Sequence, residues 1–179
     1  MKITTTSQIT LLLMLLGLAR YATAQTSPTP PPLEYVCSLK VSIADALVVG
    51  ETPHGTRRII PITGGTFEGP NIKGTIINGG ADWQVVRKDG VAELSALYTL
   101  KTEDGTLIYV KNTGMRVATP EVAQRIAKGE KVSPTEYYFR AIPVFETPPG
   151  KYEWLTKSIF VSTGVRNPDH VLITVYRVL

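Results

Sequence analysis

The sequence predicts an all-β protein in which about eight to ten antiparallel strands close into a barrel, with one short helix. Three observations lead to this fold class. Apolar and polar residues alternate along a first segment, β-type segments then follow at short spacing, and Asp-Gly pairs join several of them. Closure is expected because a large twisted sheet tends to close or split rather than stay open.

The first strand is expected at 35–43, where apolar residues alternate with mostly polar ones. This period of two predicts that Cys37 lies on the apolar face of the strand, together with Leu39 and Val41. Further strands are expected at 58–63, 65–68, 73–78, 81–87, 91–100, 106–111, 137–144, 155–163 and 171–178.

The connections carry residues that tolerate a positive φ. The pairs 89–90 and 104–105 are Asp-Gly and predict hairpin turns. Glycine is frequent between residues 50 and 80. One interpretation is a phosphate-binding loop, but no Gly-Lys-Ser/Thr follows and no helix is expected to begin there. We therefore expect bulges and corners in bent strands, with a tight turn or bulge at Asn78-Gly79-Gly80.

One helix is expected at 120–128. Thr119 is a plausible N-cap, Pro120 suits the first helical position, and Glu121 favours the positive end of the helix dipole. Gly129 is expected to end the helix.

The N-terminus has the order of a secretory signal: a positive charge at Lys2, an apolar run at 9–18 and a small-x-small site at 22–24. A membrane anchor is the alternative, but the run is about half of the ~20 residues that span a bilayer. We expect a signal peptide at 1–24, a disordered Pro/Thr-rich lead-in at 25–32 and the barrel domain at 33–179. The mature protein would then be secreted or lie in a vesicle lumen, without stable membrane insertion.

Charge and composition argue against several classes. Removal of the signal lowers the formal charge of +4 by two, and no basic run remains to bind nucleic acid. Cys37 is the single cysteine, so no intrachain disulfide is possible and a buried free thiol is expected. His54 and His170 lack a Cys/His cluster, and we expect neither a metal nor an organic cofactor.

Several motifs resemble one family. These are the segments 64–70 (GGTFEGP), 79–83 (GGADW), 138–140 (YFR) and 152–155 (YEWL), followed by Phe160. They resemble the UPF0311 family, also called domain-of-unknown-function family 3237, over nearly all of 33–179. The resemblance implies one compact barrel, lipocalin-like or dirigent-like, and implies little about chemistry. Ser95 and Leu97 stand where the family is expected to carry an acid and an arginine, which implies a more apolar interior if that strand faces the lumen.

Three residues are candidates for chemistry. Asp82 follows a Gly-Gly turn, and its pKa would rise in a desolvated barrel mouth; alternatively it bonds the backbone of its own turn. Tyr138 and Arg140 share one face of a strand, where an inward pair would bind a carbonyl, enolate or phenolate oxygen. The alternative for Arg140 is a buried salt bridge.

Five further residues are expected to bind a substrate, as aromatic walls or as a polar contact. They are Trp83, Tyr98, Trp154, Phe160 and Lys73.

Two functions of different classes fit these residues. The first is a cofactor-independent enzyme of secondary metabolism that steers the isomerisation or cyclisation of an apolar reactive substrate, including a pericyclic step such as a hetero-Diels–Alder addition. The second is a lipocalin-like carrier that binds an apolar or aromatic small molecule without changing it. A purely structural barrel without a cavity is a third, weaker idea, and a homo-oligomer is possible in each case.

Overall fold

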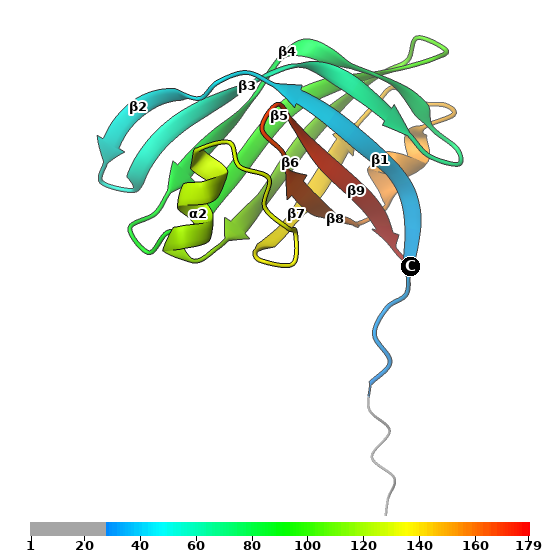
Figure 1. The fold of residues 1–179 in the computed structure, drawn as a ribbon. Helices are drawn as coiled ribbons and strands as arrows, with labels where there is room; N and C mark the ends of the chain where they lie inside the picture. Colours follow the sequence, from blue (N-terminus) through cyan, green and yellow to red (C-terminus); the bar gives the residue numbers. More distant parts are fainter. Residues whose placement is uncertain (1–27) are drawn as a thin grey trace, which may run out of the picture. The chain divides into compact units, whose positions relative to one another are not determined.

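The structure is a computed structural model that describes residues 28–179, in which most residues belong to strands (Figure 1). A signal peptide at 1–24 and the start of the lead-in lie outside the described residues. The elements are β1 Leu33–Ile43, β2 Leu47–Thr52, β3 Gly55–Glu68, β4 Lys73–Val86, β5 Ala92–Thr102, β6 Leu107–Val117, α2 Pro120–Ala127, β7 Tyr138–Glu146, the 3-10 helix η2 Glu153–Lys157, β8 Phe160–Arg166 and β9 His170–Val178.

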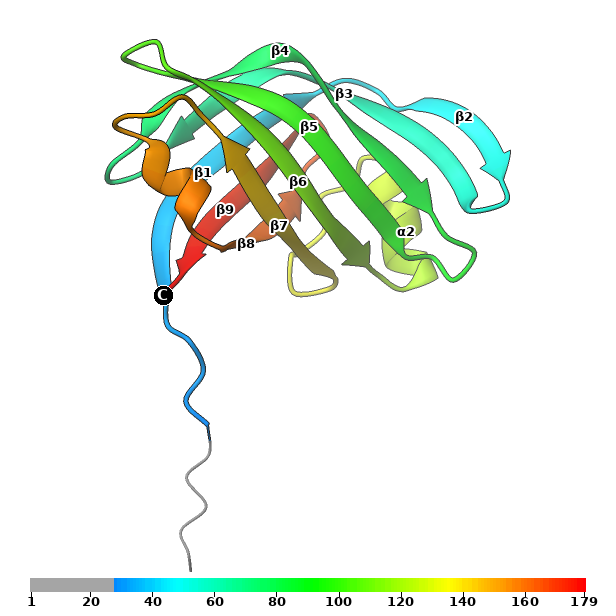
Figure 2. The same cartoon turned by 180° about the vertical axis from the view of Figure 1, so that it is seen from behind.

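The strands form a closed antiparallel barrel, as predicted. Their order is β1-β9-β8-β7-β6-β5-β4-β3, and pairing of β1 with β3 closes the eight-stranded ring. β2 pairs only with the first part of β3, so the β2–β3 hairpin extends beyond the ring (Figures 1 and 2). In both views, α2 and this hairpin lie at one end of the barrel and η2 lies toward the other.

Glycine bulges let two strands run further than the sequence predicted. The expected strands at 58–63 and 65–68 are one strand, β3, and those at 73–78 and 81–87 are one strand, β4. The register shifts between Ile62 and Gly65 in β3 and between Ile77 and Ala81 in β4. At Gly65, φ is 134° and an added Cβ would lie 2.0 Å from the carbonyl oxygen of Lys40, so only glycine fits.

Other strands also differ from the expectation, and β6 runs six residues past the expected end at 111. The edge strand β2 was not predicted, because its residues 47–49 are exposed and show no alternation. The strand expected at 155–163 begins five residues later, because Glu153–Lys157 form η2. The predicted helix and hairpins are confirmed: the hydroxyl of Thr119 accepts from the amide of Val122, and the Asp-Gly turns have positive φ at their glycines.

Large side chains fill the barrel toward the η2 end. The rings of Phe145 and Phe160 are 5.1 Å apart, and Trp154 lies 6.1 Å from Phe160. Cys37 is buried in the same core, as expected, and burial raises the pKa of its thiol to about 12. Any space for a ligand must therefore lie toward the α2 end.

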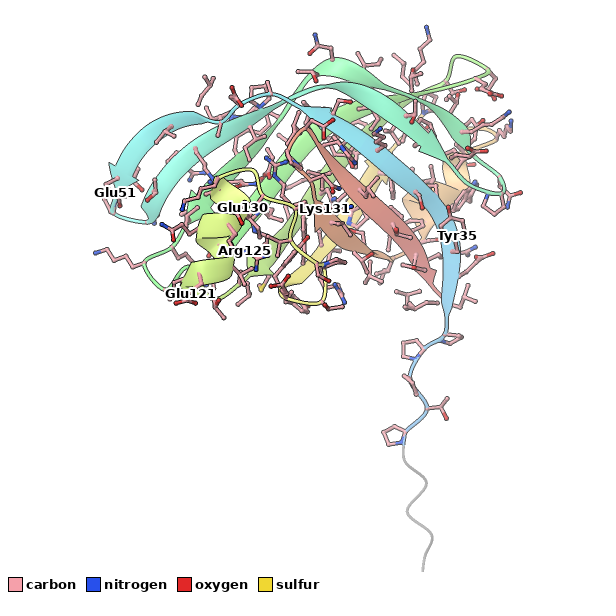
Figure 3. All side chains as sticks on the ribbon, in the orientation of Figure 1. Tyr35, Glu51, Glu121, Arg125, Glu130 and Lys131 are labelled. Carbon is pink, nitrogen blue, oxygen red and sulfur yellow. The ribbon has the colours of Figure 1, made fainter. Side chains whose placement is uncertain are left out.

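Helix α2 is held in place by apolar packing on its inner face and by ion pairs on its outer face. Val122 and Ile126 are buried, while Arg125 on the outer side pairs with Glu130 at 3.4 Å and with Glu136 at 2.7 Å (Figure 3). These ion pairs tie the helix to the loop that follows it. Across residues 28–179, no helix has the length and apolar character needed to cross a membrane.

Candidate functional site

A cavity of about 60 Å³ lies inside the barrel toward the α2 end. The space exists because the inward residues at this level are small: Ala96 on β5 and Ala141 on β7. The preceding inward residues of the same strands, Leu94 and Phe139, are larger. The lining is mostly apolar with a few polar side chains, which is the usual makeup of a small-molecule site. The polar members are Asp82, Gln84, Tyr98, Asn112, Arg116 and Arg166.

A wider vestibule of about 580 Å³ adjoins this cavity. The two share Ile60, Arg116 and Arg166 as lining residues, and Arg58 lines the vestibule from β3. α2 supplies the opposite wall through residues such as Gln124 and Ile126, together with 127–129. The cavity and the vestibule together therefore form a pocket whose junction carries arginines.

Asp82 is the acid of the cavity. It pairs in register with Ile60 on β3 and with Ala96 on β5. One carboxyl oxygen, Oδ2, accepts from Nε2 of Gln84 at 2.5 Å, and the other, Oδ1, accepts from the amide of Ser95 at 2.8 Å. Burial raises the pKa of Asp82 above its usual value, against the opposing effects of these two bonds and of nearby arginines. Such a carboxyl holds its proton to a higher pH than an exposed aspartate does.

Two of the three arginines have polar partners. Nε of Arg58 donates to Oε1 of Gln84 at 3.0 Å, which links this arginine through the glutamine to Asp82. The guanidinium of Arg166 donates to the carbonyl oxygens of Asn167 and Pro168. Burial lowers the pKa of both arginines.

Arg116 differs from the other two arginines. It is only 8% exposed, yet its guanidinium makes no ion pair or hydrogen bond with any residue of 28–179. Burial, together with the charges of Arg58 and Arg166, lowers its pKa to about 10, so it stays protonated at neutral pH. The charge of Asp82 offsets part of the cost of burying this cation. No acceptor among the described residues bonds the guanidinium directly, so the geometry suits an anionic or strongly hydrogen-bond-accepting ligand.

The inner end of the cavity carries two more polar groups. Asn112 on β6 pairs in register with Ala96, so it lies in the same row as Asp82, and Tyr98 lies two positions further along β5. Burial raises the pKa of the Tyr98 phenol, and the neighbouring Asn112 side chain works against that rise. Both residues are buried, so water has little access to this end.

The structure brings together only part of the predicted site. Asp82 and Tyr98 line the cavity, as expected. The expected inward orientation of Tyr138 and Arg140 is wrong: Tyr138 is 49% exposed, and both lie on the outer face of β7 with the guanidinium 5.1 Å from the ring centre. The alternation of the strand places Phe139 inside instead.

Four other predicted residues also lie away from the cavity. Trp83 is on the outer face of β4, because its neighbour Asp82 faces inward. Lys73 is exposed and pairs with Glu103 at 2.9 Å. Trp154 and Phe160 pack near η2, as described above.

The family departure at Ser95 and Leu97 does not alter the cavity lining. Both residues are on the outward positions of β5, whereas Leu94, Ala96 and Tyr98 line the cavity. The inference of a more apolar interior from these two residues is therefore wrong.

Sequence reasoning missed the polar residues that distinguish this cavity: Arg58, Gln84, Asn112, Arg116 and Arg166. A signal was present in β6, where the inward positions run Ile108, Val110, Asn112, Gly114 and Arg116. In a strand whose alternate residues are apolar and face inward, a polar residue at one of these inward positions is a candidate for a site. Over residues 28–179, no cluster of three or more His, Cys, Asp or Glu side chains is arranged to hold a metal ion.

The fold defines a single-domain antiparallel β-barrel with an internal cavity. The chain belongs to the family described as protein of unknown function DUF3237, which matches residues 31–178. The UPF0311 protein RPA1785 of Rhodopseudomonas palustris is 41% identical over 151 residues, covering 83% of this chain and 99% of that protein. The crystal structure of RPA1785 superposes on this chain with a TM-score of 0.83, covering 86% of this chain and 100% of the other. A crystal structure of a Clostridium acetobutylicum protein of unknown function is 37% identical and superposes with a TM-score of 0.77, with the same coverage of both chains.

One distant relative has a named activity. The hydroalkoxylation enzyme phnH of Penicillium herquei is 29% identical over 143 residues, covering 79% of this chain and 80% of that enzyme. A crystal structure of an enzyme from Penicillium herquei has the same fold, with a TM-score of 0.64 at 23% identity and coverage of 86% and 98%. One distant homologue of this chain thus has the name of an enzyme, while the UPF0311 relative carries no named activity.

Proposed function

We propose that this barrel is a cofactor-independent cyclase that adds a hydroxyl oxygen across a carbon–carbon double bond of the same small molecule. The observation that carries the proposal is the unpaired, buried guanidinium of Arg116 in a largely apolar cavity that also holds the protonatable carboxyl of Asp82. The name of the fungal relative, a hydroalkoxylation enzyme, supports this reaction class.

The charges of the pocket favour an acidic substrate. The pocket lining carries four basic side chains, Arg58, Arg116, Arg166 and Lys128, against two acids, Asp82 in the cavity and Asp45 in the vestibule, so the pocket has a surplus of positive charge. Charge-assisted hydrogen bonds from a guanidinium to a phenolate, enolate or carboxylate are strong in a dry site. A phenol with an unsaturated side chain combines such an oxygen with an apolar body. The cavity of about 60 Å³ would take the side chain, and the ring would lie in the vestibule of about 580 Å³, with Arg116 at the junction.

The proposed step is balanced without a co-reactant. Protonated Asp82 gives its proton to one alkene carbon, the hydroxyl oxygen attacks the neighbouring carbon, and the hydroxyl proton returns to Asp82. One O–H bond and one π bond break, while one C–O and one C–H bond form, so the product is an isomer of the substrate. Arg116 stabilises the partial negative charge that the oxygen carries as its proton passes to the Asp82 carboxylate, and this keeps the oxygen nucleophilic while the C–O bond forms.

The test uses 2-prenylphenol as the probe, with its cyclic ether isomers separated by chromatography. Wild-type protein is expected to accelerate cyclisation, and Arg116→Met and Asp82→Asn are each expected to lower the rate by about 10²–10³-fold. Arg140→Met is the matched control, because Arg140 is the exposed arginine on the outer face of β7 and should leave the rate unchanged.

Each alternative gives a different result. A carrier would bind the phenol and release it unchanged, which would refute the enzyme proposal. A pericyclic enzyme of the hetero-Diels–Alder type needs orientation rather than proton transfer. Retention of the full rate by Asp82→Asn would therefore favour that mechanism over acid-assisted addition.

A further inference from the structure

The inner end of the cavity holds a polar atom without a partner. Asn112 is 6% exposed, and its amide oxygen Oδ1 is buried with no hydrogen-bond partner among the described residues. Asn112 lines the cavity, in register with Ala96 and hence in the row of Asp82. Buried polar groups are nearly always satisfied, so an exception at a cavity wall points to a bound group.

We infer that Asn112 and Tyr98 form a hydroxyl-binding subsite at the inner end of the cavity, so the substrate carries a second hydroxyl remote from its acidic end. This inference deepens the proposed function and rests on it. A hydroxyl fits because it can donate to an amide oxygen and also accept from an amide N–H or from a phenol. A cationic amine does not fit, since the three arginines of the pocket would repel it.

The register sets the spacing of the two polar ends. Asn112 and Arg116 are both inward residues of β6 and lie four positions apart, which corresponds to about 13 Å along a strand. Leu94, Ala96 and Phe139 provide apolar walls between these two ends. Because the cavity between these ends holds only about 60 Å³, the expected ligand joins an acidic group at the Arg116 end to a hydroxyl at the Asn112 end through a narrow apolar chain rather than a ring.

The experiment compares two matched acids with narrow chains, 6-hydroxyhexanoate and hexanoate, by titration calorimetry on the full-length barrel domain. The wild-type protein is expected to bind the hydroxylated acid about 10-fold more tightly, because one neutral hydrogen bond to an otherwise unsatisfied group is gained. Asn112→Leu should abolish this preference and leave hexanoate binding within about 2-fold. Ser162→Ala, which removes a buried hydroxyl bonded to the carbonyl of Ala141 on another strand, is the control and should keep the preference.

The outcomes separate this inference from the function on which it rests. Binding of both acids with equal affinity by the wild-type protein overturns the hydroxyl subsite alone, with water then satisfying Asn112. Binding of neither acid overturns the anion site, and the subsite with it. Preferential binding without any cyclisation of 2-prenylphenol overturns the proposed reaction but supports the subsite. An Asn112→Leu protein that keeps the preference shows that Asn112 is scaffold.

Discussion

Replacement of Arg116 by methionine tests the central feature of the pocket through stability as well as activity. The pKa of Arg116 falls from an ordinary value of 12.5 to about 10 on folding. At about 1.36 kcal/mol per pKa unit, this difference corresponds to a cost of about 3 kcal/mol for folding with Arg116 charged. Because the folded-state pKa is the lower one, the cost is fully present below pH 10 and is relieved as pH rises from about 10 toward 12.5.

Arg116→Met is therefore expected to raise the free energy of unfolding at pH 7 by about 1–3 kcal/mol, since methionine keeps an apolar stem without the charge. Urea unfolding followed by tryptophan fluorescence measures this change. Arg140→Met, at the exposed arginine of β7, should stay within about 0.5 kcal/mol of wild type. A loss of stability in Arg116→Met would show that its guanidinium has a structural partner, and the anion-site reasoning would then fail.

Three further predictions concern the acid, the bulges and the N-terminus. Because the pKa of Asp82 is raised and the protonated carboxyl is the reactive form, cyclisation by wild type should slow as pH rises, while the residual rate of Asp82→Asn should show no such dependence. Gly65→Ala should destabilise the protein by about 2 kcal/mol more than Gly79→Ala, measured by thermal melts. Both glycines have a positive φ, but only at Gly65 would the added Cβ meet backbone atoms. Equal losses of stability would contradict the close approach of Gly65 to Lys40. Mass measurement of protein from the native host should give a mature chain that begins at Gln25, and an intact Met1 would refute the signal peptide.

The fold could be predicted from sequence because its determinants are local. The alternation in β1, the Asp-Gly turns and the helix start at Thr119 each depend on a few neighbouring residues. β2 was missed because its stability comes from pairing with β3 rather than from its own pattern. The lengths of β3 and β4 were missed because a glycine pair in an extended chain permits either a turn or a bulge, and only the partner strands decide between them.

The candidate site was harder to predict because the sequence of β7 does not show which of its two sets of alternating residues faces inward. On β7, the inward residues include Phe139 and Phe145, but the outward residues Ile142 and Val144 are apolar as well, at 56% and 55% exposure. Hydrophobicity alone therefore could not show that Arg140 faces outward. Arg58, Arg116 and Arg166 come from β3, β6 and β8, and only closure of the barrel brings them to one pocket.

The positive surplus of the pocket also bears on the choice between a functional and a purely structural barrel. A filled barrel without a cavity is contradicted by the space between Asp82 and Arg116. An inward arginine in a structural core would normally be paired, because an unpaired buried charge lowers stability. Here Arg58 is bonded to Gln84 and Arg166 to backbone carbonyls, while Arg116 is left free at the junction of the cavity and the vestibule. A residue that destabilises the empty barrel and faces the space where a ligand would lie is best explained by the stabilisation it gives to a bound anion.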